Sequence, residues 1–184
     1  MKKLFTLMLS LALFSGSTAF AATTYYVQLG TNGAATWDAG YASTGTIVDL
    51  STVNTGGTPA SFNAWFNDKS LVTPVYSGAA FVSGDQVWIA KGTYYLTGTV
   101  TLKAGVSIFG GFAGTAAETI ASRSKSSSDA WGFSNFTALD GSDGGVKKYI
   151  GISGGSSTTT IIDGLTIQNC HNVSTTSSGG GVKL

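Results

Sequence analysis

From residue 83 onward, the sequence is a succession of very short apolar segments separated by turn residues. Each segment is an apolar-x-apolar run of three or four residues, broken by Gly, Asp, Asn or Ser. The segments are residues 87–90, 93–96, 99–102, 106–109, 149–152, 160–162, 165–167 and 182–184. Strands this short fit poorly in a β-sandwich, where strands usually run ~5–6 residues. They fit a solenoid, in which each coil carries two or three short strands and stacks on the next.

Composition narrows the fold class in the same direction. Charged residues make up 10% of the 184-residue chain, against a usual ~25%. The charged residues that form the polar face of amphipathic helices are therefore too scarce for a helical bundle. Two prolines without a Gly-X-Y period exclude collagen. A hydrophobic content of 42% excludes wholesale disorder. We therefore expect an all-β chain rich in glycine and small hydroxyl residues.

Residues 1–21 have the three parts of a secretory signal peptide. Lys2 and Lys3 form a basic start, residues 4–14 form an apolar stretch, and residues 19–21 are an Ala-x-Ala cleavage site. The apolar stretch is too short to span a ~30 Å hydrocarbon core, and no longer one follows, so we expect no transmembrane segment after signal removal. Loss of both lysines takes the net charge from +1 to −1. The mature chain has no basic excess, so we expect no nucleic-acid partner.

The mature chain divides into an N-terminal strand and cap segment, residues 22–82, and a solenoid segment, residues 83–184. Residues 23–29 are β-branched and aromatic and predict a strand. Residues 114–131 form a Ser-rich run that predicts a loop leaving a coil. Cys170 is the only cysteine, which excludes a disulfide framework. We expect it to be a small buried hydrophobe.

Residues 58–67 are the best helix candidate in the chain. Thr58 suits the N-cap and Pro59 the first helical position. One face of the helix carries three aromatic side chains, those of Phe62, Trp65 and Phe66. A helix this short must be held by packing that face onto another part of the protein.

Five stretches of the sequence resemble secreted bacterial right-handed parallel β-helix proteins. They are residues 84–94, 102–112, 138–141, 162–169 and 179–182. The group is pectin-lyase-like in fold and close to the polymorphic outer-membrane and surface-repeat proteins. The resemblance implies that the solenoid is a right-handed parallel β-helix, with a fold that hosts lyases, hydrolases and adhesins.

The resemblance also gives roles to particular residues. It implies that the helix at residues 58–67 plugs the open end of the coil stack. It implies that Asn169 stacks with equivalent Asn residues at a coil corner. The sequence reaches Leu184 in what reads as the middle of a strand, so we expect the chain to be the N-terminal portion of a longer repeat protein.

Acidic residues offer one weak metal site. The lyases of the resembling group use clustered carboxylates with Ca²⁺, and its hydrolases use paired Asp residues. Asp140 and Asp143 are the closest such pair here and are the candidate Ca²⁺ ligands, although turn-forming Asp-Gly pairs are the favoured interpretation. Arg123 and Lys125 have no carboxylate cluster beside them in the sequence, and His171 stands alone. We assign no catalytic residue and no cofactor besides this Ca²⁺.

Three aromatic side chains are candidates for ligand binding: those of Trp88, Tyr95 and Trp131. Trp88 lies between two aliphatic residues, so it faces outward if they face inward. Outward aromatic rings can stack on the apolar face of a sugar ring. They can equally be covered by residues 22–80, which is the favoured interpretation.

These observations predict a secreted or surface-exposed protein of a Gram-negative bacterium that binds a polysaccharide or a cell-surface glycan without catalysis. The alternative is the N-terminal part of a polysaccharide lyase or glycoside hydrolase whose catalytic coils lie beyond residue 184. A third interpretation is a cap with its first coils and no function separable from further coils. The binding protein is the leading hypothesis, because no catalytic group is assigned within the sequence.

Overall fold

The structure is a computed structural model. It describes residues 21–30, 37, 45–50, 61–67, 80–115, 118–128, 132–143, 146–147, 151–154, 159–170 and 181–183. The predicted signal peptide lies outside these residues except for Ala21. No helix within the described ranges is long and apolar enough to cross a membrane.

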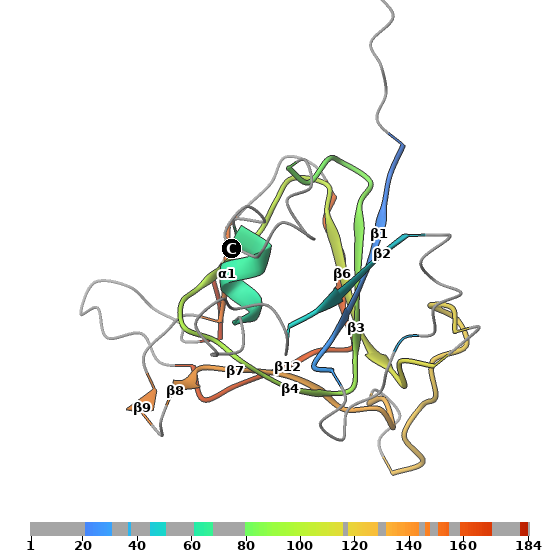
Figure 1. Cartoon of the computed structure of the whole chain (residues 1–184). Coiled ribbons are helices and arrows are strands. Elements are labelled where there is room, and N and C mark those ends of the chain that lie inside the picture. The colour runs from blue at the N-terminus through green and yellow to red at the C-terminus, as the bar shows by residue number, and fades with distance from the viewer. Residues whose placement is uncertain are drawn as a thin grey trace, which may run out of the picture.

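Most of the described helices and strands are short parallel strands (Figure 1). Sheet A comprises β1 (Thr24–Gln28), β2 (Gly45–Asp49), β3 (Gln86–Ala90), β6 (Ser107–Phe112) and β11 (Ile162–Asp163). Sheet B comprises β4 (Gly92–Tyr95), β7 (Thr137–Asp140) and β12 (Thr166–Gln168), and sheet C comprises β5 (Val100–Thr101), β10 (Ile152–Ser153) and β13 (Val182–Lys183). An antiparallel pair, β8 (Ser142–Asp143) and β9 (Val146–Lys147), and the helix α1 (Phe62–Asn67) complete the described elements. The expected all-β class is confirmed.

From β3 onward, the strands of sheets A, B and C follow one another in a repeating order. β3, β4 and β5 lie in sheets A, B and C in turn. β6 then pairs with β3, β7 with β4 and β10 with β5, all parallel. β11, β12 and β13 follow the same order. In Figure 1, β4, β7 and β12 accordingly overlie one another along the bottom of the view, with sheet A rising on the right.

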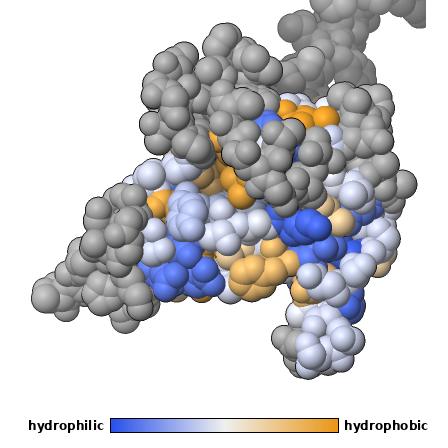
Figure 2. Space-filling view, turned by 60° about the horizontal axis from the view of Figure 1, so that its bottom comes forward, coloured by the Kyte–Doolittle hydropathy of each residue, from blue (hydrophilic) through white to orange (hydrophobic). Residues whose placement is uncertain are grey.

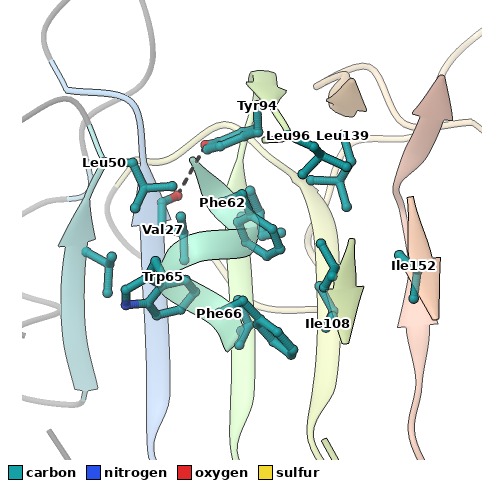
Figure 3. Packing of buried hydrophobic residues seen from close by; sticks show 14 of the residues in the cluster. Val27, Leu50, Phe62, Trp65, Phe66, Tyr94, Leu96, Ile108, Leu139 and Ile152 are labelled. Carbon is teal, nitrogen blue, oxygen red and sulfur yellow. Dashed lines mark hydrogen bonds between the residues drawn. The ribbon is translucent and has the colours of Figure 1, made fainter. Parts of the chain in front are cut away.

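The parallel register places inward side chains of successive strands directly against one another. The aligned inward positions are Val87, Ile108 and Ile162 in sheet A, Tyr94, Leu139 and Ile167 in sheet B, and Val100, Ile152 and Val182 in sheet C. The first two members of each row are at most 1% exposed and form one core (Figure 3). Such burial is worth about 1.5–3 kcal/mol per large aliphatic side chain, so these rows supply much of the fold's stability.

Helix α1 packs on this core with its aromatic face (Figure 3). The side chains of that face, Phe62, Trp65 and Phe66, are at most 1% exposed. The Ser61 hydroxyl accepts a hydrogen bond from the Ala64 amide at 3.4 Å and so caps the helix. The helix therefore begins later than its predicted start, and the predicted cap residues Thr58 and Pro59 lie outside the described residues.

The polar side chains of α1 bond to backbone groups before and within β5. Asn63 Oδ1 accepts a hydrogen bond from the Thr97 amide at 2.9 Å. The Asn67 amide group donates to the Thr99 carbonyl at 2.7 Å and accepts from the Thr101 amide at 2.8 Å. The two asparagines thus satisfy backbone groups at the free edge of sheet C, in the place that a further strand would take.

A β-bulge interrupts the pairing of β3 with β6. Trp88 pairs with Phe109 and Ala90 with Phe112, so residues 110–111 stand opposite a single residue of β3. Gly111 has a φ of +85°, a conformation that L side chains rarely adopt. The bulge turns Phe112 onto the outer face of sheet A, where it joins Phe109 in an aromatic cluster separate from the core.

Replacing Gly111 with alanine should destabilise the fold. An added Cβ would lie 2.6 Å from Cγ of Phe133, in a strained backbone conformation. We expect a loss of about 2 kcal/mol in the free energy of unfolding, measured by urea denaturation. Gly181→Ala is the matched control, because the Cβ added there meets only Ile167 at an ordinary 3.9 Å. Equal midpoints for the two variants would contradict the bulge's role.

Candidate functional site

Trp88 faces away from the core, as its alternation with aliphatic neighbours predicts, but its ring is largely covered. It stacks on Phe112 with ring centroids 4.8 Å apart and meets the edge of Tyr26 at 5.6 Å. Trp37, which is 2% exposed, packs on the same cluster, and the Trp88 indole donates to the Gln86 side chain at 2.8 Å. Residues of the N-terminal segment, Tyr26 and Trp37, therefore help to cover the ring of Trp88, as the favoured interpretation expects. Its covered ring offers little surface for stacking on a ligand.

Tyr95 lies on the outer face of sheet B and is 59% exposed. The register aligns it with Asp140 of β7, which is aligned in turn with Gln168 of β12. Its neighbour Tyr94 points inward and donates its hydroxyl to the Ala90 carbonyl at 2.9 Å. Tyr95 is therefore an available aromatic side chain. The third candidate, Trp131, lies outside the described residues.

An open groove lies beside the starts of β7 and β12. Its volume is about 340 Å³, within the range of small-ligand sites. It is lined by Ser126, Gly132, Phe133, Asn135, Phe136, Thr137, Gly164, Leu165 and Thr166. Phe136 is 51% exposed, an unusual state for a large aromatic side chain. In Figure 2, which brings the bottom of Figure 1 forward, apolar residues form a small patch bordered by hydrophilic ones.

Arg123 fixes the loop that forms one wall of this groove. Its guanidinium donates to the carbonyls of Ile120 and Gly110, each at 2.8 Å, and to Asp163 Oδ2 at 2.6 Å. It also lies 4.3 Å from the ring centroid of Phe133. The Arg123 side chain is 4% exposed, so this ion pair is largely shielded from solvent on the arginine side. The predicted loop is therefore folded back onto sheet A and held there.

The two limbs of the loop are also joined to each other. Lys125 and Phe133 form an isolated antiparallel bridge, and the Ser126 amide donates to the Gly132 carbonyl at 3.0 Å. The Lys125 ammonium lies 3.7 Å from the ring centroid of Phe133. Phe133 thus has two cations over its ring. Of the two aromatic side chains that line the groove, Phe136 is therefore the more exposed to solvent.

Phe136 and its neighbour Asn135 are not among the residues predicted from the sequence to bind a ligand. Alternation along residues 136, 138 and 140 places Phe136 on the outer face of sheet B, the face that also carries Tyr95. That alternation is visible in the sequence once β7 is recognised. The groove itself depends on Gly164 and Leu165 lying beside Phe136, which only the pairing of β7 with β12 establishes.

Asp140 is a buried carboxylate at the end of β7, 4% exposed. Oδ1 accepts hydrogen bonds from the Ser142 amide at 2.8 Å and the Ser142 hydroxyl at 2.6 Å. Gln168 donates to Oδ2 at 2.7 Å, and Asn169 donates to both oxygens at 3.1 Å. Burial alone would raise the pKa of Asp140, but these hydrogen bonds outweigh it and lower the pKa below the usual value. The carboxylate joins two successive turns of the chain.

Of the two candidate Ca²⁺ ligands, the structure therefore describes the side chain of Asp140 alone. Asp140 directs its oxygens at donors of the protein, and nothing is described of the Asp143 side chain. Within the described ranges, no three His, Cys, Asp or Glu side chains lie together as a metal site would require. Asn169, expected at a coil corner, has a left-handed φ of 53° and bonds to Asp140.

Cys170 follows this corner and is partly buried. It packs against the core, and its thiol donates to the Gln168 carbonyl at 3.3 Å. Burial raises the pKa of the thiol, which keeps it protonated at neutral pH. Its surroundings agree with the expected role of a small hydrophobe.

Comparison with known proteins does not assign the chain to a family. No protein-family model, no curated protein and no solved structure matches it. The features that bear on function are therefore the groove, Tyr95 and the arrangement of the sheets. The resemblance to parallel β-helix proteins remains an expectation from the sequence.

Asp140→Asn should destabilise the fold in a pH-dependent way. The variant loses a charged acceptor facing Gln168 and Asn169, so we expect a loss of about 1–3 kcal/mol at pH 7. Because the folded-state pKa lies below the unfolded value of ~3.9, this contribution is present above that value and lost as the pH falls through the folded pKa. Urea denaturation at a series of pH values measures it, with Tyr95→Phe as control. A stability difference that persists unchanged at pH 2 would contradict the charged network.

Proposed function

We propose that this protein is a right-handed parallel β-helix protein, exported to the surface or surroundings of a Gram-negative bacterium, that binds glycans without catalysis. The repeated order of sheets A, B and C supports the β-helix, since each recurrence begins a new coil. Parallel connections within a sheet are right-handed in ~98% of cases, which supports the handedness. The three-part pattern of residues 1–21 supports export.

The observation that carries glycan binding is the exposed Phe136 in an open groove. A phenyl ring that is 51% exposed offers an apolar surface to the C–H face of a pyranose. Asn135, Ser126 and Thr166 line the same groove and supply amide and hydroxyl groups that hydrogen-bond sugar hydroxyls. Apolar stacking beside a few polar groups is the usual composition of a small-ligand site.

Tyr95 extends this surface along sheet B. It lies beside Asp140, which is four residues beyond Phe136, or about 13 Å at ~3.3 Å per residue. Two exposed aromatic rings on one strand-built face suit a ligand longer than a single sugar. The surface therefore fits a chain of sugars better than a monosaccharide.

Phe136→Ala should weaken binding of a polysaccharide by about tenfold, because tenfold corresponds to ~1.4 kcal/mol and a stacked ring contributes on that scale. Phe136→Tyr should retain binding. Affinity electrophoresis through gels that contain polysaccharides measures both, with Tyr95→Ala expected to give a smaller loss.

Ile161→Ala is the matched control, because Ile161 is also a half-exposed hydrophobe, at 48%, but does not line the groove. Unchanged binding by Phe136→Ala would contradict the groove as the binding site. No retardation of the wild-type chain by any polysaccharide would contradict glycan binding itself.

Export has its own test. The intact mass of the protein recovered outside the inner membrane should place its first residue at Ala22, after cleavage of residues 1–21. Ala21→Arg puts a large charged residue at the cleavage site and should leave the precursor uncut. A wild-type protein that retains Met1 in the cytoplasm would contradict the proposed location.

A further inference from the structure

We infer that the groove beside Phe136 selects uncharged glycan chains over uronate chains. This inference rests on the proposed glycan binding and adds the chemical class of the ligand. It depends on how charges are distributed in and around the groove. The resembling fold by itself favours neither class.

Among the residues that the structure describes, the lining of the groove contains no ionisable side chain. Its polar side chains are those of Ser126, Asn135, Thr137 and Thr166, and the remaining members are apolar residues or glycines. Thr137 is 1% exposed, and its hydroxyl accepts a hydrogen bond from the Gly111 amide at 3.0 Å. The accessible groups are thus an amide and two hydroxyls, which pair well with neutral hydroxyl groups.

The charges nearest the groove are engaged with other partners. Arg123 is buried and bonded to Asp163, whose neighbour Gly164 lines the groove. The Lys125 ammonium lies over the ring of Phe133. Neither cation belongs to the lining, so a carboxylate inside the groove would lose water without gaining a positive partner.

Lys91 is a further cation at this end of sheet B. The next residue, Gly92, donates its amide to the Phe136 carbonyl at 2.9 Å, so Lys91 lies across from Phe136 on the neighbouring turn. Lys91 is exposed and outside the lining. A solvated ammonium at the rim contributes little and is screened by salt.

The experiment compares matched oligosaccharides by isothermal titration calorimetry on the purified chain. The probes are neutral hexasaccharides of glucose, galactose and mannose, with oligogalacturonate and oligomannuronate of the same length. We expect at least one neutral probe to bind about tenfold more tightly than either uronate. That affinity should change less than roughly twofold between about 10 mM and about 0.5 M NaCl.

Three variants complete the test. Lys91→Gln and Lys103→Gln should each leave neutral binding within roughly twofold of wild type, since Lys91 lies outside the lining and Lys103 bonds to the Asn67 carbonyl of α1. Phe136→Ala should abolish the preference, with its urea midpoint checked to confirm folding. Tighter, salt-sensitive binding of a uronate that is lost in Lys91→Gln would overturn the inference and leave glycan binding intact. Absence of binding to all probes would instead overturn the proposed function.

Discussion

Stacking of short parallel strands in register is the constraint on which the rest of this structure depends. A strand of two to six residues makes few backbone hydrogen bonds, so no single strand here is stable alone. Inner strands such as β7 are instead held between partners on both sides, and their inward side chains lie against the equivalent side chains of the neighbouring strands. Tyr94, Leu139 and Ile167 form one such row, and a change in any of them is felt by its neighbours.

The same register determines where the protein departs from regularity. An edge strand needs a partner, and at sheet C the amides of Asn63 and Asn67 from α1 take that role. The bulge at residues 110–111 turns Phe112 outward, and Arg123 donates to the carbonyl of Gly110 within it. Arg123 also holds the loop beside β7 and β12. The bulge in β6 therefore helps to position the wall of the groove, because it contains the carbonyl to which Arg123 bonds.

Local patterns predicted much of this fold, whereas the candidate site depended on contacts across the sequence. Alternation correctly gave the outward direction of Trp88, and aromatic spacing gave the helix that contains Trp65. The partner of Arg123 could not be predicted, because Asp163 lies 40 positions away and meets it only when β11 pairs with β6. Phe136 was missed for the same reason, since an aromatic residue before a strand is ordinary until its neighbours are known.

Scarcity of charge links the architecture to the proposed recognition. In a chain that is 10% charged, several of the described ionisable side chains serve the fold: Asp85 accepts the amides of Thr23 and Val82, Asp140 joins two turns, and Arg123 clamps a loop. Each carries its charge into contact with the protein rather than toward solvent. What remains on the outer face of sheet B is an aromatic, amide and hydroxyl surface, whose natural complement is a ligand of apolar ring faces and neutral hydroxyl groups. A neutral sugar chain has that composition. A carboxylate on the sugar would need a cation as its partner, and the nearby Arg123 is already paired with Asp163.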